Sequence, residues 1–585
     1  MYLKQTKQKN GRINLSVVHG YRDQETGVTK HKVIKNFGYV DEYEDVYDDP
    51  IAHFKEVAKE MEKERLESLE ELVHVGKVNL NQQMELDENA LSSLGFLPFS
   101  FIFHELALDK FLQSRQRRFK IDFSLKDVLQ LLVYSRILDP GSKRKDYLSK
   151  DKYPLSLNFE MHDFYRGLDY LNELRENLLL HTHRELGFRY GRNTGHVFYD
   201  VSNFFFEIDE EDGLRRKGFC KRNSGKPLVQ LGLLLDEDAI PITYQLFKGN
   251  THDSQTLRPV LEETRKTYEL GRIITVADKA LNSGDNVAAH IVNGDGFIFS
   301  QTIRGASEKF KDYVFNPDGY REVQGIVKSL EKDEEEATIF KMKSRAYPQE
   351  FWVTHSDGKK RAIALDVKQI VCYNEQYARR QSHKREEAIL KAQKIIANPS
   401  RYNKDDSAGA LRYVANISFD KNTGEVLETK KHPYLDVDKI IEDANYDGYY
   451  AIITSEYHMP DSEVVKAYHD LWEIERSFRI TKSTLKTRPV YLSTKQRIEA
   501  HFLSCFLSLL ILRLLARRLD NKYSPEVIVD ALREYQICLM EGNLYRVTSY
   551  NEVIEDIGMA VGLDLSKRYL TPGKIRSLVA ATKKF

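Results

Sequence analysis

The spacing of apolar residues divides the chain into segments of different character. Residues 1–48 alternate polar and apolar positions, which predicts a small β-hairpin unit. Residues 49–97 contain a charge-laced helical pattern typical of a connector, and residues 98–192 repeat apolar positions at helical spacing. We therefore expect a hairpin unit, a helical connector and then a helical unit.

The pattern changes near residue 193, where apolar and β-branched runs alternate with turn residues and later with helical stretches. This order predicts an α/β fold with a mixed sheet covered by helices. Residues 193–302 form its first part and 447–520 its second, with 303–446 as a β-rich insertion between them. Residues 521–585 are expected to be a C-terminal helical region.

The most apolar stretch, Phe502–Leu519, is interrupted by Arg513 and is shorter than the roughly 20 residues that a membrane span requires. It predicts a buried helix, and the polar N-terminus has no secretory core, so we expect no membrane association. The four cysteines are far apart in the sequence and lack metal-ligand spacing, which indicates free thiols in a reducing cytoplasm.

The formal net charge is zero, so total charge does not predict a polyanionic partner. A neutral protein can still bind DNA when its basic residues share one face. Several basic clusters are candidates, although a single cluster is more often a solvated surface. The helical unit 98–192 contains two of them, at residues 115–120 and 143–145, and is expected either to bind DNA or to mediate dimerisation.

Three acidic residues on separate segments carry the strongest chemical signal. Asp200 interrupts an apolar strand, Asp278 closes another strand, and Glu475 lies in a helical pattern. Carboxylates brought together by a fold can hold divalent cations such as Mg²⁺ and so support phosphoryl transfer. Each also has a plain alternative: a turn cap for Asp200, a helix cap or turn for Asp278, and a surface ion pair with Arg479 for Glu475. Asp253 is interpreted only as a helix cap.

At about 100° per residue, one stripe of a continuous helix about 60° wide would carry Tyr468, Leu471, Glu475 and Lys482, with Arg479 beside them. Such a mixed face suits a surface that binds metal and phosphate together. On the alternative interpretation the face is solvated, and the helix buries its opposite side.

These motifs resemble those of the DDE insertion-sequence transposases, in the branch with a Y-x2-R-x3-E-x6-K signature and a β-rich insertion. The resemblance rests on YDVSNFFFE, VADKALNS, KGNTHDSQTL and the spacing of Tyr468, Glu475 and Lys482. Leu471 departs from the pattern by occupying the arginine position, for which Arg476 or Arg479 can compensate. The resemblance implies an RNase H-like fold.

The resemblance also implies a mechanism in which Asp200, Asp278 and Glu475 hold two Mg²⁺ ions, with Mn²⁺ as a substitute. The substrates would be double-stranded DNA at terminal inverted repeats and at the target. Family members cut the element's ends and join the 3′-hydroxyl groups to target DNA. The assembly would be a homodimer or larger, cytoplasmic and associated with the nucleoid.

Five residues are candidates for DNA contact on the same resemblance: Tyr468, Lys482, Arg479, Arg476 and Trp352. Trp352 could stack on a flipped base, and its alternative is a core position. Two rival functions remain open at this point: an RNase H-like nuclease without strand transfer, and an inactive transposase derivative that acts as a DNA-binding repressor.

Overall fold

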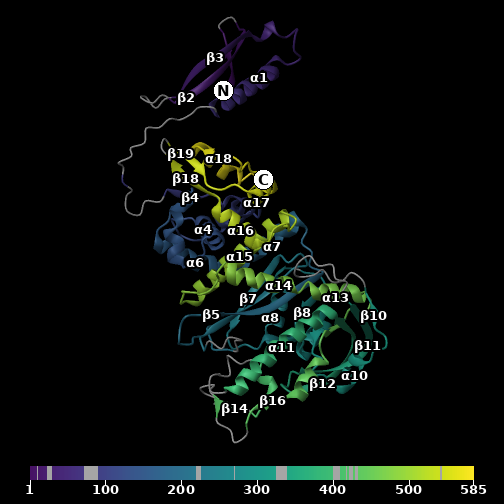
Figure 1. The fold of residues 1–585 in the computed structure, drawn as a ribbon. Coiled ribbons are helices and arrows are strands. Elements are labelled where there is room, and N and C mark those ends of the chain that lie inside the picture. Colours follow the sequence, from purple (N-terminus) through teal and green to yellow (C-terminus); the bar gives the residue numbers. More distant parts are fainter. Residues whose placement is uncertain are drawn as a thin grey trace. The chain divides into compact units, whose positions relative to one another are not determined.

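The larger of the two units in this computed structural model contains a nine-stranded sheet (Figure 1). The structure describes residues 1–8, 11–22, 29–70, 83, 90–218, 225–268, 270–323, 339–398, 409–416, 418–419, 426–427, 432–540 and 543–584. The smaller unit comprises Met1–Leu86 with Met540–Asn543, and the larger one comprises Asp87–Leu539 with Leu544–Phe585. Each unit is described by itself.

The smaller unit is a three-stranded antiparallel sheet with one helix, so a third strand joins the predicted hairpin. Phe54 of the helix packs against Phe37, with ring centroids 4.4 Å apart, and Leu15 and Val17 are buried in the same unit. The elements are β1 (Tyr2–Lys7), β2 (Ile13–Arg22), β3 (Thr29–Tyr39), η1 (Val40–Glu42) and α1 (Pro50–Glu70).

Residues 97–190 contain a set of helices in the larger unit. Ser124 caps the main helix, α4, by accepting a hydrogen bond from the Asp127 amide, and twelve of its fourteen residues are buried. The elements are β4 (Leu91–Ser93), α2 (Leu97–Glu105), α3 (Leu108–Gln116), α4 (Leu125–Leu138), α5 (Lys143–Leu148), η2 (Lys150–Lys152), α6 (Met161–Glu173) and α7 (Arg175–Tyr190).

The predicted mixed α/β sheet is also confirmed. Its strand order is β10-β11-β12-β17-β9-β8-β5-β6-β7, with β5, β8 and β9 parallel and the other pairs antiparallel. The strands are β5 (His196–Phe205), β6 (Leu228–Leu235), β7 (Pro241–Lys248), β8 (Ile274–Ala277), β9 (Gly296–Gln301), β10 (Arg321–Glu322), β11 (Phe340–Thr354), β12 (Lys360–Asn374) and β17 (Tyr449–Thr454).

The segment between β9 and β17 extends this sheet, because β12 pairs with β17 along six residues. The same stretch also contains a long helix, α11. The remaining elements from β7 to β17 are η3 (Asp253–Gln255), α8 (Leu257–Tyr268), η4 (Lys279–Leu281), α9 (Gly284–Asn293), α10 (Glu308–Phe315), α11 (Glu375–Ala397), η6 (Leu411–Tyr413), β13 (Val414–Ala415), β14 (Ser418–Phe419), β15 (Val426–Leu427), β16 (Tyr434–Leu435) and α12 (Val437–Ala444).

The chain after β17 is mainly helical, but beyond residue 520 short strands accompany the helices, which the expectation of a C-terminal helical region did not include. Strand β18 pairs with β4, which lies more than 440 residues earlier, so its partner could not be identified locally. The elements are α13 (Asp461–His469), α14 (Trp472–Arg479), the π-helical η7 (Ile480–Thr484), α15 (Lys495–Arg518), α16 (Pro525–Glu534), β18 (Gln536–Met540), β19 (Leu544–Val547), α17 (Glu552–Val561), β20 (Tyr569–Leu570) and α18 (Pro572–Ala581).

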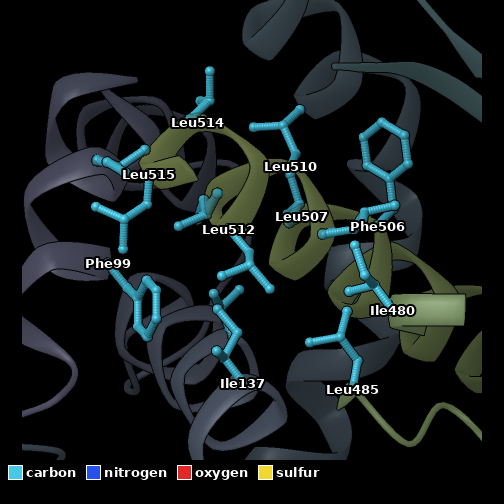
Figure 2. Packing of buried hydrophobic residues seen from close by; sticks show 14 of the residues in the cluster. Phe99, Ile137, Ile480, Leu485, Phe506, Leu507, Leu510, Leu512, Leu514 and Leu515 are labelled. Atoms are coloured by element: carbon cyan, nitrogen blue, oxygen red, sulfur yellow. The ribbon is translucent and has the colours of Figure 1, made fainter. Parts of the chain in front are cut away.

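Helix α15 packs against the helical segment, as Figure 2 shows around Phe99, Ile137 and Leu507. It packs against α2, α4 and α6 and also against β7 and η7. Among the described residues it is the one helix long and apolar enough to cross a membrane, and 94% of that apolar window is buried inside the protein. The prediction of a buried helix here is confirmed.

Candidate active site

Asp200 and Asp278 are neighbours across the parallel pair β5–β8. In that pair Phe198 lies opposite Val276, and each aspartate follows its strand partner by two residues. Because side chains alternate along a strand, Asp200 lies on the face of Phe198 and Asp278 on the face of Val276. Both apolar residues belong to the hydrophobic core that includes α15. The two carboxylates therefore point to one face of the sheet, on strands about 4.8 Å apart.

Glu475 approaches the same face of the sheet from a helix that packs on it. Its helix, α14, packs against β5 through the side that buries Ile474, Ser477 and Phe478. The Glu475 side chain is exposed, whereas Asp200 and Asp278 are half-buried. The fold thus brings together three acids that the sequence places 78 and 197 residues apart.

The electrostatics of Asp200 show that these acids share one region. The pKa of Asp200 is raised to about 7. Burial is the largest cause; the Val201 amide lowers the pKa, and the negative charges of Asp278, Glu475 and Asp253 add to the rise. Like charges that face one another disfavour ionisation in this way. We call these four residues the carboxylate cluster.

Asp253 is the member that the sequence interpretation missed. It is the first residue of η3, whose N-cap is His252, and η3 packs against η4, which directly follows Asp278. Its carboxylate accepts a hydrogen bond of 3.1 Å from the amide of Gln230 on β6. The motif KGNTHDSQTL was the available signal, but a cap was the commoner role for a lone aspartate at that position.

The carboxylates affect one another's ionisation without forming a closed coordination shell. Among the residues that the structure describes, no group of three or more His, Cys, Asp or Glu side chains is arranged to hold a metal ion. The donor set itself fits a hard divalent cation, because it consists of oxygen ligands whose negative charge raises the pKa of Asp200. Asp200, Asp278 and Glu475 are the residues that would hold such an ion.

Tyr468 and Lys482 both lie beside the carboxylate cluster. Burial raises the pKa of Tyr468 to about 12; the Ser300 hydroxyl opposes this rise, and Asp278 and Glu475 add to it. Tyr468 is therefore a neutral hydrogen-bond donor at physiological pH. The Lys482 ammonium donates to the hydroxyl of Ser202, two residues beyond Asp200 on the same face of β5.

The expected single helix carrying these residues is wrong. Helix α13 ends at His469, α14 begins at Trp472, and η7 follows as a π-helix from Ile480. Side chains on this segment bond back to the preceding turn, as when the Thr481 hydroxyl donates to the Ser477 carbonyl over 2.7 Å, and such bonds bend helices. The stripe of an ideal helix is therefore interrupted, and Lys482 reaches β5 through the π-helical turn.

The remaining candidates for DNA contact have different surroundings. Arg476 pairs with Glu473 at 3.7 Å and lies over the Trp472 ring, so its guanidinium contacts these two residues rather than the carboxylate cluster. Arg479 is exposed, and Leu471 packs partly buried against the core. None of these contacts supplies the arginine missing at Leu471.

Trp352 lies on the surface, so the alternative of a core tryptophan is wrong. It is 63% exposed on β11. Its backbone carbonyl oxygen would be 2.3 Å from a Cβ at Gly284, so only glycine allows α9 to start against this strand. The carboxylate of Asp285 accepts a 2.7 Å hydrogen bond from the Thr354 amide and holds the same contact. The hairpin that carries Trp352 is thus fixed to the start of α9, six residues after Asp278.

Two family models match this chain. The model for the transposase DDE domain matches residues 195–511, and the model for the IS1634 family transposase N-terminal domain matches residues 3–71. No curated protein matches the chain. Similar solved structures include a piggyBac transposase synaptic complex with hairpin DNA, at 8% identity and a TM-score of 0.34, covering 86% of this chain and 87% of that one.

A Mos1 transposase paired-end complex with the left transposon end is similar at 11% identity and a TM-score of 0.14, covering 41% of this chain and 66% of that one. These TM-scores are too low to support a conclusion about this chain, so its family membership rests on the family models. The DDE model alone spans more than half of the 585 residues and includes Asp200, Asp278 and Glu475. The chain therefore belongs to the DDE transposases.

Proposed function

We propose that the protein binds the terminal inverted repeats of a mobile element, cleaves DNA at their ends and joins the freed 3′-hydroxyl groups to target DNA. The register that makes Asp200 and Asp278 neighbours on one face, with Glu475 opposite them, supports this proposal most strongly. The rival outcomes of a cleavage test are hydrolysis without joining, and binding without cleavage.

The two chemical steps are both displacements at phosphorus. In the first, water attacks the phosphodiester, the bond to the 3′ oxygen breaks, and a 3′-hydroxyl is released. In the second, that hydroxyl attacks a target phosphodiester and the target's own 3′ oxygen leaves. Two Mg²⁺ ions, or Mn²⁺ in their place, would supply Lewis-acid stabilisation of the attacking and leaving oxygens when held by Asp200, Asp278 and Glu475.

The chain's own residues position the substrate for these steps. Lys482 lies at Ser202, where its ammonium can bind a phosphate oxygen as a point charge. The Tyr468 hydroxyl stays protonated and offers a neutral donor to the phosphodiester. Arg479 and Trp352 are exposed and able to contact flanking DNA and an unpaired base, whereas Arg476 would have to leave Glu473 first.

Pairing of two element ends requires at least two active sites, so we propose a homodimer or larger assembly on DNA. We also propose that it acts in the cytoplasm at the nucleoid. Cys372 and Cys505 are buried free thiols and Cys538 is a partly exposed one, which fits a reducing compartment, while Cys220 lies outside the described residues.

The test is cleavage of a labelled duplex carrying the inverted repeat that flanks the gene, with Mg²⁺ or Mn²⁺. We expect nicking at the repeat boundary by the wild type, loss of nicking in Glu475→Gln, and unchanged binding of the repeat. Glu463→Gln is the matched control, because Glu463 is an exposed glutamate on the neighbouring helix α13. Cleavage by Glu475→Gln at the wild-type rate would rule out its role.

A second substrate separates the remaining outcomes. A pre-cut end with a free 3′-hydroxyl and a supercoiled target should give joined products with the wild type. Hydrolysis without joined products would identify a nuclease, and tight binding with neither product would identify a repressor.

A further inference from the structure

A basic cleft of about 630 Å³ lies between the α4–α5 region and the segment that follows η7. One wall runs from Arg136 to Arg144, and the other runs from Lys486 to Leu492, with Tyr165 and His501 completing the lining. Neither wall belongs to the carboxylate cluster. The two walls are about 350 residues apart in the sequence, yet hydrogen bonds join them directly.

The lining carries positive charge without a single carboxylate. Its five cationic residues are Arg136, Lys143, Arg144, Lys486 and Arg488. Two other surface hollows, of about 570 and 400 Å³, each include at least one acidic residue in their lining. In a chain of zero net charge, this cleft therefore concentrates positive potential that favours a polyanion.

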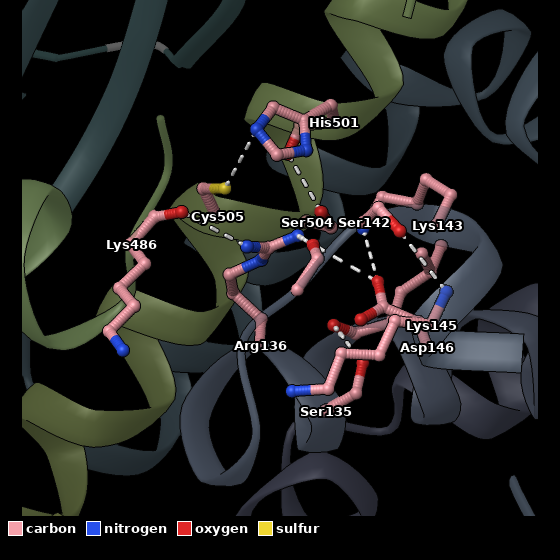
Figure 3. A network of polar contacts seen from close by, with 12 residues as sticks. Ser135, Arg136, Ser142, Lys143, Lys145, Asp146, Lys486, His501, Ser504 and Cys505 are labelled. Atoms are coloured by element: carbon pink, nitrogen blue, oxygen red, sulfur yellow. Dashed lines mark hydrogen bonds and ion pairs between the residues drawn. The ribbon is translucent and has the colours of Figure 1, made fainter. Parts of the chain in front are cut away.

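Buried groups fix the shape of the cleft (Figure 3). Arg136 is 1% exposed and donates to the carbonyl of Gly141 at 3.0 Å and to that of Lys486 at 3.2 Å, so it ties the two walls together. His501 contacts the Thr487 carbonyl at 2.9 Å and so holds the backbone of the second wall in place. Lys486 adopts φ of 42°, a left-handed conformation rare for a residue with a side chain, at the point where Arg136 binds its carbonyl.

The buried charges beneath the cleft are not balanced. The Asp146 carboxylate accepts a 2.7 Å hydrogen bond from the Lys143 ammonium and lies 3.7 Å from Arg136, so one anion serves two cations. Burial lowers the pKa of Lys143, and the nearby Arg136 charge lowers it further. Burial likewise lowers the pKa of His501 well below its usual value, so this imidazole adds no charge. A positive excess remains under the lining, and an anion in the cleft would offset it.

The mouth of the cleft is open to a large ligand. Arg144 and Lys486 are exposed there, and the structure records no carboxylate partner for either among the described residues. Tyr491 stands at the rim with 69% of its surface exposed. Cations beside an open aromatic ring are the elements with which proteins follow a nucleic-acid backbone and stack its bases.

The cleft is also aligned with the carboxylate cluster along β5. Lys482 binds Ser202, and the Arg488 guanidinium lies 4.7 Å from the centre of the Phe205 ring, five residues beyond Asp200. Five strand residues span roughly 17 Å. That length corresponds to about five nucleotides of duplex DNA at 3.4 Å each. Cations thus follow the strand from the carboxylates toward the cleft.

We propose that the basic cleft binds the sugar-phosphate backbone of the substrate DNA about five nucleotides from the scissile phosphate. This inference rests on the proposed function for the identity of the DNA. It adds a binding site, built from the α4–α5 region and residues 486–492, that holds one strand after it leaves the carboxylate cluster.

The test compares two double variants in DNA binding without divalent metal. Arg144→Ala with Lys486→Ala removes the two exposed cleft cations, and Lys574→Ala with Arg576→Ala removes an exposed lysine and arginine from α18 as the matched control. Each lost phosphate contact should reduce the slope of log affinity against log salt concentration by about 0.9. We expect the cleft variant to lose about 1.8 from this slope and the control to keep the wild-type value.

Neutral phosphates then locate the contact. Methylphosphonate substitution four to six nucleotides from the cleavage position should weaken binding by the wild type and by the control several-fold, but leave the cleft variant unchanged. Equal sensitivity of all three proteins, or an unchanged salt slope in the cleft variant, would overturn the proposal. Thermal unfolding of both double variants checks that these exposed substitutions preserve the fold.

The cleft and the proposed function can fail separately. Metal-dependent cleavage at the repeat together with an unchanged salt slope would overturn the cleft alone. A cleft-dependent slope and neutral-phosphate effect at the repeat boundary, without cleavage or joining, would overturn the proposed chemistry and keep the cleft as a DNA-binding site.

Discussion

The carboxylate cluster and the basic cleft lie at opposite ends of the path along β5 and handle charge in opposite ways. In the cluster, burial raises the pKa of Asp200, and with the smaller contributions of three neighbouring acids it reaches about 7. In the cleft, Asp146 partly balances the buried Arg136 and Lys143, and backbone carbonyls accept hydrogen bonds from both terminal nitrogens of the guanidinium. The cluster is therefore organised to receive cations and the cleft to receive an anion.

This difference explains why the net charge of zero gives so little information. Charges of the two signs are separated by roughly 17 Å along one strand rather than mixed over the surface. A phosphodiester strand that carries its own charge and reacts with bound metal needs both regions at once. The following predictions break or sharpen the comparison, beginning with the largest expected effect.

Removing one carboxylate from the cluster should affect chemistry far more than binding. We expect Asp278→Asn to lower the rate of metal-dependent cleavage by about 10³-fold or more, equivalent to roughly 4 kcal/mol. The reason is the loss of a carboxylate that would hold the metal ion, which stabilises the charge of the transition state. Single-turnover cleavage measures this rate. Asp312→Asn, an exposed aspartate on α10, is the control and should keep the wild-type rate. A fall of less than tenfold would exclude Asp278 from the reacting centre.

Removing the one carboxylate beneath the cleft should affect stability instead. Asp146→Asn leaves Lys143 and Arg136 as buried cations without an anion, which should cost about 3 kcal/mol of unfolding free energy. The midpoint of urea unfolding measures the loss. Adding Lys143→Met should restore part of it, since the second variant removes one of the two uncompensated charges. A loss below about 1 kcal/mol would show that the buried cations do not depend on Asp146.

The pH dependence of stability should distinguish the cluster from the cleft. An aspartate has a pKa near 3.9 in the unfolded chain, whereas Asp200 has a pKa of about 7 in the folded protein. The unfolded state therefore loses its proton first as pH rises, and the metal-free folded protein loses stability between about pH 4 and 7. Above pH 7 this penalty is complete, and below pH 4 it is absent.

We accordingly expect Asp200→Asn to stabilise the metal-free protein by roughly 4 kcal/mol at pH 8 and by almost nothing at pH 4. Urea unfolding at several pH values in the presence of a chelator measures the difference. Asp312→Asn should show no such trend. A stabilisation that is equal at both pH values would mean that the gain comes from packing rather than from ionisation.

The sequence predicts the parts of these regions better than their combination. The strands that carry Asp200 and Asp278 are correctly predicted because their apolar runs follow from local residue types. Their neighbour relation depends on the parallel register of β5 with β8, which involves residues about 80 positions apart. The role of Asp253 is hidden for the same reason, since its position beside η4 is a tertiary contact.

The cleft is even harder to predict from the sequence. Its basic clusters are visible in the sequence, but nothing local indicates that Arg136 binds the carbonyl of Lys486. The interruption of the expected catalytic helix is likewise decided by the π-helical turn and its Ser and Thr back-bonds. Periodicity predicts elements, whereas register, helix irregularity and long-range contacts determine the site.

The smallest expected effect concerns the rim of the cleft. Tyr491 is exposed beside Arg488, and base stacking on such a ring contributes about 1 kcal/mol. Tyr491→Ala should therefore weaken binding of repeat DNA that has an unpaired flank by about fivefold, whereas Tyr491→Phe should bind like the wild type because it keeps the ring. Fluorescence anisotropy at fixed salt measures both affinities. Equal weakening by the two variants would assign the effect to the hydroxyl and would leave phosphate binding as the whole contribution of the cleft.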